Sequence, residues 1–265
     1  MRRKLTVIGN RKLGAYNVLT LADPAGPRPQ PGQFSMLAAV ADWGGGQDER
    51  PHLPRAFSVA RWHDGEAHYL LEDVGPGTHR LCALQVGEEV WALGPLGRGF
   101  ALPVAGQRAI LVGGGVGIAP LVILQDQLLR HDDATVPPVV LLGFRDRARA
   151  QGATLLQGAQ IATDDGAFGH RGLVTDLLAR ELGEDPQAVV YACGPAPMLE
   201  ATRAMCAVRG VPARLALESG MACGFGACFG CVVPTRDGYL RVCIDGPVID
   251  AERLVRVDAH AGAPE

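Results

Sequence analysis

The stretch Glu218-Ser-Gly-Met-Ala-Cys-Gly-Phe-Gly-Ala-Cys-Phe-Gly-Cys231 carries the most specific pattern in the chain. Its three cysteines follow the spacing C-x4-C-x2-C, and a fourth cysteine comes after eleven further residues. Three closely spaced cysteines and one distant cysteine form the ligand pattern of plant-type [2Fe–2S] clusters. The sequence therefore predicts such a cluster with the ligands Cys223, Cys228, Cys231 and Cys243.

The residues between these cysteines suit a loop that wraps closely around an inorganic core. A cluster held by four thiolates is negatively charged, so backbone N–H groups must point at its sulfur atoms. Such a path needs residues without a Cβ atom, which Gly220, Gly224, Gly226 and Gly230 supply. Two other uses of cysteine match the pattern less closely. A structural zinc site prefers two C-x2-C pairs, and disulfides need an oxidising compartment.

The composition is that of a globular protein and narrows the possible function classes. The chain has 265 residues, enough for two domains and a small third, and 48% of them are hydrophobic. A formal net charge of −3 gives no electrostatic basis for binding nucleic acid or an anionic membrane. Met1–Asn10 lacks the apolar core of a signal peptide, and the odd number of seven cysteines argues against a fully paired secreted framework. We therefore expect a cytoplasmic protein without a membrane span.

The first third of the chain has the pattern of an antiparallel β-barrel. Short apolar runs, separated by glycine and proline turns, recur from residue 2 to about residue 102. One expected strand begins with a candidate ligand-binding motif, Arg55-Ala56-Phe57-Ser58. An arginine can hold a phosphate through two hydrogen bonds, and a serine hydroxyl can bond a ring heteroatom. An ordinary edge strand explains the same four residues equally well. The expected strands are Tyr16–Leu21, Gln33–Val40, Arg55–Arg61, Ala67–Glu72 and Glu88–Leu93.

A second candidate motif in this third is the turn Val74-Gly-Pro-Gly-Thr78. Gly75 and Gly77 allow the backbone to approach a ligand closely. Thr78 is expected to cap the short helix that follows. The free N–H groups at the start of that helix would then form an anion site.

The middle third changes to alternating strands and helices. Ala109–Val112 is a continuous apolar run, as in a buried parallel strand, and a glycine loop and a helix follow it. A glycine loop between a strand and a helix is typical of nucleotide-binding sites. We therefore expect a parallel α/β sheet with its ligand at the carboxyl ends of the strands. The loop glycines are Gly113, Gly114, Gly115 and Gly117; later strands are expected at Pro138–Gly143, Gln160–Thr163 and Ala188–Cys193, with helices at Arg145–Leu156, Leu173–Glu181 and Met198–Arg209.

Other polar or unusual segments fall at the same carboxyl ends. The segment Cys193-Gly194-Pro195 ends one strand, and its cysteine is either a small buried hydrophobe or a thiol beside a nicotinamide ring. The choice between NAD and NADP stays open from the residues alone. An acid favours the ribose of NAD and an arginine favours a 2′-phosphate; Arg145, Arg147 and Arg149 follow one strand, and Asp164 and Asp165 follow the next.

Barrel, nucleotide-binding fold and cysteine segment together resemble the ferredoxin–NADP reductase superfamily. The cysteine segment directly follows the nucleotide-binding part, which narrows the resemblance to the electron-transfer subunits of class 1B dihydroorotate dehydrogenases. The resemblance runs from about Leu5 to Val248, with Ala56 where proline is common and Arg98 where the family often has asparagine. It rests on Arg55–Ser58, Val74–Thr78, Gly94–Gly97, Val112–Pro120, Thr163–Gly166, Ala192–Pro195, Met221–Cys231, Arg241–Cys243 and Asp245–Pro247.

This resemblance implies FAD and NAD beside the [2Fe–2S] cluster. FAD would lie between barrel and nucleotide domain, with Arg55 and the Gly77-Thr78 turn at its pyrophosphate and Ser58 near its ring system. NAD would bind over Gly113–Gly117 with its nicotinamide near Cys193. A hydride carries two electrons and a [2Fe–2S] cluster accepts one at a time, so a flavin is the required intermediary. Hydride transfer at the flavin needs no general acid or base, and no catalytic residue is predicted.

The resemblance also implies a partner. In the family, the cluster exchanges electrons with FMN in a separate dihydroorotate dehydrogenase subunit, in a heterotetramer of two subunits of each kind that serves de novo pyrimidine (UMP) biosynthesis. Electrons from dihydroorotate would pass through the cluster and FAD to NAD+. The expected domains are residues 1–102 for the FAD-binding barrel, 103–215 for the NAD-binding α/β domain and 216–265 for the cluster.

Two other functions fit all or part of the same pattern. A flavin and iron–sulfur reductase that uses NAD(P)H to serve a ferredoxin or another oxidoreductase would share every motif and differ only in its partner. A redox-sensing module, whose cluster gates association, would leave Gly113–Gly117 and Arg55–Ser58 unexplained.

Overall fold

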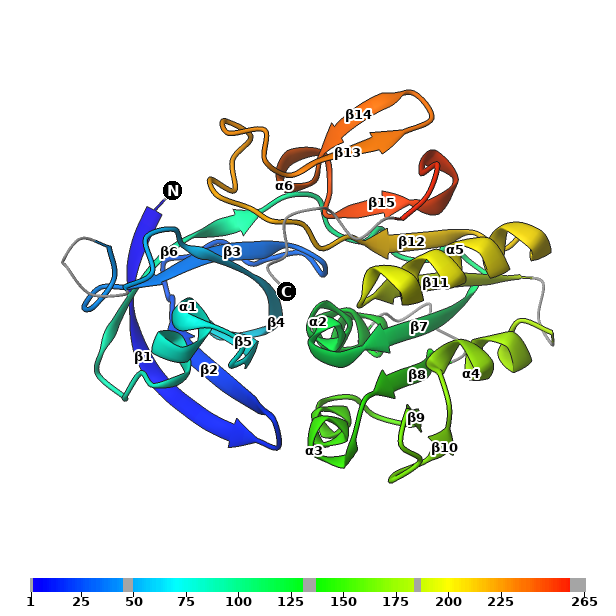
Figure 1. The fold of residues 1–265 in the computed structure, drawn as a ribbon, viewed down its shortest axis with the longest axis horizontal. Helices are drawn as coiled ribbons and strands as arrows, with labels where there is room; N and C mark the ends of the chain where they lie inside the picture. The colour runs from blue at the N-terminus through cyan, green and yellow to red at the C-terminus, as the bar shows by residue number, and fades with distance from the viewer. Residues whose placement is uncertain (1, 45–49, 131–136, 184–186, 258–265) are drawn as a thin grey trace.

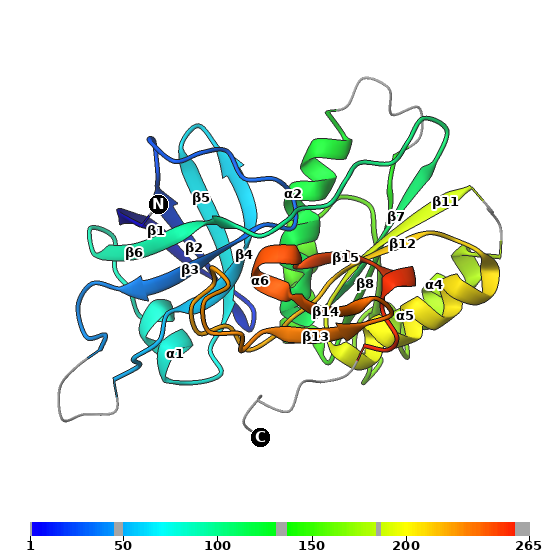
Figure 2. The same cartoon turned by 90° about the horizontal axis from the view of Figure 1, so that it is seen from above.

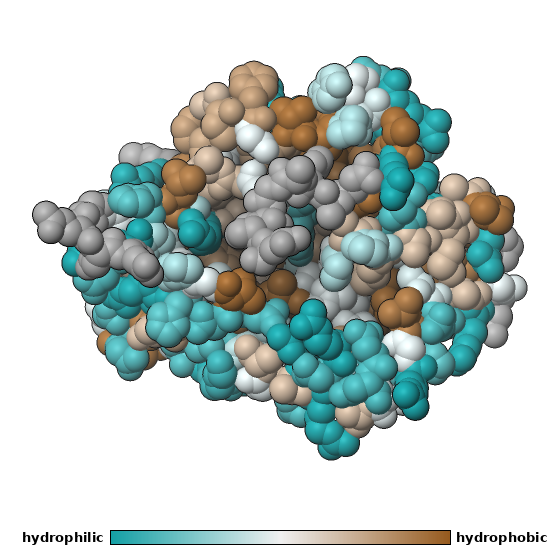
Figure 3. Space-filling view, in the orientation of Figure 1, coloured by the Kyte–Doolittle hydropathy of each residue, from teal (hydrophilic) through white to brown (hydrophobic). Residues whose placement is uncertain are grey.

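The computed structural model describes residues 2–44, 50–130, 137–183 and 187–257. An N-terminal barrel lies beside a sheet that has helices on both faces, and the C-terminal segment lies along one side of both (Figures 1 and 2). Figure 3 shows apolar residues exposed at the top of the molecule, over the C-terminal segment. No helix in the described part of the chain is long and apolar enough to cross a membrane.

The barrel consists of six antiparallel strands in the closed order β1-β2-β5-β4-β3-β6. The five expected strands are confirmed, with ends shifted by up to three residues, and β1 is additional. In β1 only Leu5 and Val7 are buried, so its apolar signal is weak. β4 lies inside the closed barrel, but it pairs with β5 only from Val59 onward, so the Arg55–Ser58 motif is paired with β3 alone and its other side is open. The strands are β1 (Arg2–Leu13), β2 (Tyr16–Ala22), β3 (Phe34–Ala39), β4 (Arg55–His63), β5 (Glu66–Glu72) and β6 (Glu89–Leu96).

The short helix α1 (Pro76–Cys82) follows β5 and packs Leu81 into the barrel core. Its N-cap is Gly75, and Thr78 caps the helix from the third helical position, by accepting from the Gly75 N–H, instead of from the N-cap position. Thr78 lies in the first turn, where its hydroxyl accepts hydrogen bonds from the backbone N–H groups of Val74 (2.9 Å) and Gly75 (3.0 Å). The hydroxyl therefore closes the turn that precedes the helix.

The α/β domain has a seven-stranded sheet in the order β10-β9-β8-β7-β11-β12-β15, and every pair except β12–β15 is parallel. Alternate strand residues face opposite layers. Leu111 and Tyr191 pack with α2, which faces the barrel, and Ile110 and Val190 pack with α4 and α5. The strands are β7 (Arg108–Gly114), β8 (Val139–Phe144), β9 (Ala159–Thr163), β10 (His170–Arg171), β11 (Ala188–Cys193), β12 (Ala213–Ala216) and β15 (Val248–Asp250).

One segment of this domain for which the sequence predicts a long helix is only partly α-helical. The segment Arg145–Leu156 forms a single helical turn, α3 (Arg147–Ala150), followed by the 3-10 helix η2 (Gln151–Leu155). Asp146 accepts a hydrogen bond from the Arg149 N–H (2.9 Å), which fixes the start of α3. The remaining helices are η1 (Gly115–Ile118), α2 (Ala119–Leu128), α4 (Val174–Glu181) and α5 (Ala196–Arg209).

The C-terminal segment contains the cysteine loop and little regular structure. A hairpin of β13 (Val232–Thr235) and β14 (Gly238–Arg241) leads into α6 (Val242–Asp245), and η3 (Ala251–Arg253) follows β15. The residues expected to form the cluster domain thus also supply the last strand of the central sheet. Cys231 and Cys243 are buried in the same core cluster as Met36 of the barrel.

Candidate functional site: a cysteine loop and an interdomain cleft

A cleft of about 530 Å³ opens at the carboxyl ends of β7, β8, β9 and β11. The barrel closes one side with residues at the end of β5, and the starts of α4 and α5 close the other. Ligands of open α/β sheets bind at this edge, as expected from the sequence. The lining residues are Glu72, Val74, Gly114, Gly115, Val116, Gly143, Phe144, Arg145, Arg149, Asp164, Leu173, Val174, Thr175, Pro195, Pro197, Met198, Ala201 and Glu218.

Two predicted loops meet at the base of this cleft. A Cβ atom on Gly117 would lie 2.6 Å from the Cα atom of Gly194, and one on Gly114 would lie 2.6 Å from Sδ of Met198. Glycine is therefore required for this close approach. Gly113 packs beneath, against Ile118. The glycine loop and the Cys193–Pro195 segment form one surface, although they lie far apart in the sequence.

Cys193 lies at this junction with its side chain buried. Burial raises the pKa of its thiol well above the usual value, and the nearby Glu218 carboxylate adds to the rise. The thiol therefore stays protonated at neutral pH. The interpretation of Cys193 as a buried hydrophobe is confirmed, and its position beside a nicotinamide ring stays a prediction.

Glu218 is a cleft residue that the sequence analysis did not select. The residue is accessible through the open cleft, yet the protein atoms around its carboxyl reduce hydration and raise its pKa. It comes two residues after β12, whose Ala216 pairs with Cys193 in parallel register. Recognising β12 as a further parallel strand would have placed Glu218 at the same edge of the sheet.

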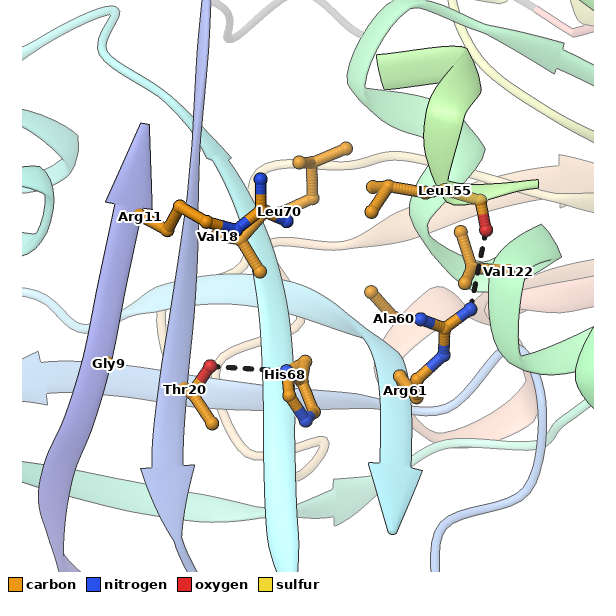
Figure 4. Close-up of a pocket in the computed structure, with 10 residues that line it drawn as sticks. All are labelled: Gly9, Arg11, Val18, Thr20, Ala60, Arg61, His68, Leu70, Val122 and Leu155. Carbon is orange, nitrogen blue, oxygen red and sulfur yellow. Dashed lines mark hydrogen bonds between the residues drawn. The ribbon is translucent and has the colours of Figure 1, made fainter. Parts of the chain in front are cut away.

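The barrel and the α/β domain are also joined by polar contacts. Nε of Arg149 donates to Oε1 of Glu72 (2.8 Å), at the mouth of the cleft. On the other side of the seam, Nε of Arg61 donates to Oδ2 of Asp126 (2.7 Å), and Nη2 donates to the carbonyl oxygen of Leu155 (3.3 Å). Figure 4 shows Arg61 reaching across this seam, beside a cavity of about 200 Å³.

The barrel motif Arg55–Ser58 faces the start of α1. A Cβ atom on Gly77 would lie 2.8 Å from Nε of Arg55, so only glycine leaves room for the guanidinium group at this place. Ala56 is exposed, Phe57 packs against the barrel core and Ser58 is half-buried opposite Phe34. The guanidinium group of Arg55 thus lies directly against the first turn of α1.

The four predicted cluster cysteines lie in two pairs. Sγ of Cys231 is 3.2 Å from Sγ of Cys243, and the Cys223 and Cys228 thiols form a second hydrogen-bonded pair. No three His, Cys, Asp or Glu side chains within the described residues converge as a single metal ion would require. In a [2Fe–2S] cluster each iron takes two cysteine sulfurs. The two pairs suit this cluster better than a tetrahedral zinc ion.

Backbone N–H groups point at these sulfur atoms, as a negatively charged cluster needs. Burial opposes ionisation of Cys223, but hydrogen bonds from the N–H groups of Cys228, Phe225 and Ala227 outweigh it and lower the thiol pKa to about 6. Gly230 N–H donates to Cys228 (3.5 Å), and Cys243 N–H donates to Cys231 (3.4 Å). The Cys223 side of the loop therefore favours a thiolate, whereas burial and the neighbouring Cys231 raise the pKa of Cys243 to about 12.

Two family models match the chain. The iron–sulfur cluster binding domain of dihydroorotate dehydrogenase B matches residues 218–255, and the oxidoreductase NAD-binding domain matches residues 111–204. The dihydroorotate dehydrogenase B (NAD(+)) electron transfer subunit of Bacillus caldolyticus is 39% identical over 269 residues, covering 96% of this chain and 98% of the relative. The chain belongs to this family. The corresponding subunit of Caldanaerobacter subterraneus subsp. tengcongensis is 34% identical over 259 residues, with the same two coverages.

This chain shares its fold with a protein of known structure. That protein is an NADH-dependent reduced ferredoxin-NADP oxidoreductase with a TM-score of 0.78 and 23% identity, covering 94% of this chain and 88% of that chain. The predicted family, fold class and role as an NAD-linked oxidoreductase component are confirmed. The family models and the fold also support the predicted [2Fe–2S] cluster, NAD and FAD.

Proposed function

We propose that the chain carries electrons between NAD and the FMN of a separate subunit that oxidises dihydroorotate. The working assembly is a cytoplasmic heterotetramer of two subunits of each kind, in the route to UMP. The name shared by the relatives, electron transfer subunit of a dihydroorotate dehydrogenase, supports this partner. Residues 1–102, 103–215 and 216–265 are the proposed FAD, NAD and cluster domains.

The cleft is the proposed NAD site. The glycine loop Gly113–Gly117 brings backbone N–H groups close to the pyrophosphate. The Cys193-Gly194-Pro195 segment is proposed to contact the nicotinamide, because Pro195 lines the cleft and Gly194 packs directly against Gly114 of the glycine loop. Since the Cys193 thiol is buried and protonated, it shapes this surface and exchanges no proton.

The corner between β4 and α1 is the proposed flavin site. The guanidinium of Arg55 and the N–H groups at Gly77 and Thr78 hold the pyrophosphate, and Ser58 donates to the ring system. Ala56, Phe57 and Gly75 contribute backbone and surface around the same ligand. When bound, FAD takes two electrons as a hydride and passes them on singly.

One contact carries the proposal, because it brings the flavin and cluster sites together. Met36 of β3 lies against Gly224 of the cysteine loop, where an added Cβ atom would be 2.5 Å from its Cγ atom. On the neighbouring strand Met36 is paired with Ala56, inside the flavin motif. A single strand of the barrel therefore separates the proposed flavin site from the cysteine loop, and the cleft reaches the second proposed flavin segment, Val74–Thr78, through Val74.

The exposed surface of the cysteine loop is the proposed place where electrons pass between the cluster and the FMN subunit. Cys228 is exposed, and Phe225 and Phe229 expose 56% and 63% of their surface beside it. Exposed aromatic side chains next to a redox group are typical of a surface that a partner covers.

An anaerobic visible spectrum of the purified chain, recorded before and after NADH is added, tests this function. We expect flavin bands with a red-shifted iron–sulfur shoulder, both bleached by NADH. Cys231→Ser should lose most of the iron and acid-labile sulfide and keep the flavin that NADH bleaches. Cys206→Ala changes another buried cysteine, outside the loop, and should keep both. A chain that stays colourless after reconstitution with iron, sulfide and FAD would refute the proposed electron transfer.

A further inference from the structure

We propose that Asp164 makes this subunit select NAD over NADP. The inference rests on the proposed dinucleotide site and adds the residue that distinguishes the two ligands. They differ only by a phosphate on the 2′ oxygen of the adenosine ribose. A carboxylate can accept hydrogen bonds from two free ribose hydroxyls and repels a phosphate at the same position.

Asp164 and Arg145 occupy equivalent places at the ends of neighbouring strands. In the parallel pair β8–β9, Phe144 is the register partner of Thr163, and the Asp164 N–H donates to the Phe144 carbonyl oxygen (3.0 Å). The next residue of each strand is therefore Arg145 or Asp164. Both are exposed and both line the cleft, so a ligand over these strand ends meets an acid and a base side by side.

The side chains of Asp164 and Arg145 form no polar contacts with other side chains in the described part of the chain, whereas those of Asp165 and Arg147 bond to the backbone of a nearby residue. Within the described residues, neither the Asp164 carboxylate nor the Arg145 guanidinium makes a hydrogen bond or an ion pair with another side chain. By contrast, Asp165 accepts from the Ala167 N–H (2.9 Å), and Arg147 donates to the Ala167 carbonyl oxygen (2.7 Å). Asp164 is thus the acid of this turn that remains available to a ligand.

The sheet order fixes which end of the dinucleotide meets Asp164. The pyrophosphate lies over the glycine loop after β7, which has β11 on one side and β8 followed by β9 on the other. The nicotinamide half turns toward Cys193 at the end of β11. The adenosine half therefore extends over the ends of β8 and β9, where Arg145 and Asp164 stand. Arg145 alone would attract a 2′-phosphate, and Asp164 opposes it.

Calorimetry on the flavin- and cluster-loaded protein tests the proposal, with ADP-ribose and 2′-phospho-ADP-ribose as probes. For Asp164→Asn we expect about tenfold weaker binding of ADP-ribose, since a charge-assisted hydrogen bond becomes neutral. Binding of the 2′-phosphorylated probe should tighten about tenfold, since a like charge is removed. Adding Arg145→Gln to Asp164→Asn should abolish that gain.

Asp165→Asn is the matched control, because it removes a carboxylate one residue away that does not line the cleft. It should leave both affinities within about twofold of the wild type. Equal changes for both probes in Asp164→Asn, no change in either, or the same change in Asp165→Asn would overturn the proposal. A wild-type protein that binds neither probe but still bleaches with NADH would overturn it too, without touching the proposed electron transfer.

Discussion

The carboxyl of Glu218 shows at the scale of one residue how the cleft alters chemistry. Reduced hydration raises its pKa, so the folded protein binds this proton more tightly than the unfolded chain does. Stability then falls as pH rises from about 4.3, the usual pKa of a glutamate, through the raised pKa of the folded state. At pH values below about 4.3 the carboxyl is protonated in both the folded and the unfolded state, so it no longer lowers the stability of the folded protein.

Glu218→Gln should therefore be more stable than the wild type at pH 8 and equally stable near pH 4. Thermal denaturation midpoints of both proteins across this range measure the difference. Glu252→Gln is the control, because Glu252 is exposed on η3, outside the cleft lining. A difference that stays constant with pH, or a variant less stable than the wild type at pH 8, would contradict the assignment.

At the scale of elements, the start of α1 depends on a glycine that makes room for a cation. Gly77→Ala adds a methyl group where Nε of Arg55 now lies, and the flexible arginine must move away. Alanine suits a first helical turn, so stability should change by less than about 0.5 kcal/mol. FAD should dissociate about ten times more readily, because the guanidinium no longer reaches the pyrophosphate.

Fluorescence titration of the apoprotein with FAD measures this loss. Arg55→Gln should weaken FAD binding similarly, and the double variant should be no weaker than Arg55→Gln alone, because both changes act through one group. Additive losses would mean that Gly77 acts on the flavin independently of Arg55.

Elements whose signals are local could be predicted from the sequence. The spacing of four cysteines and the apolar run before the glycine loop depend only on neighbours in the chain, and β11 lies at its predicted bounds, Ala188–Cys193. Other features depend on distant contacts. Gly152 packs against the ring of Tyr16 where the expected long helix gives way to η2, and Glu218 enters the cleft only because β12 joins the sheet. The sequence predicts β3, but the contact of this strand with the cysteine loop, between Met36 and Gly224, depends on how the distant segments pack.

At the scale of the whole molecule, electron transfer requires barrel and α/β domain to keep a fixed separation. Tyr16 of the barrel and Ile118 of the α/β domain belong to one core cluster, and both lie against Gly152. Polar side-chain contacts also cross the seam between the two domains. The tie between Arg61 and Asp126 is partly buried, since the Asp126 side chain is only 18% exposed. Partly buried pairs contribute more than surface pairs, because water and salt screen them less.

Asp126→Asn should weaken this tie by about 1 kcal/mol, which lowers the thermal midpoint of a protein of this size by about 2–4 °C. Glu89→Gln is the matched control: its pair with Lys4 is 2.9 Å long but exposed and lies within the barrel, so the midpoint should hardly change. The bleaching of the flavin and cluster by NADH should slow in Asp126→Asn alone, because only that change loosens the seam. Equal midpoints and equal rates for both variants would mean that the apolar contacts hold the two domains together without the ion pair.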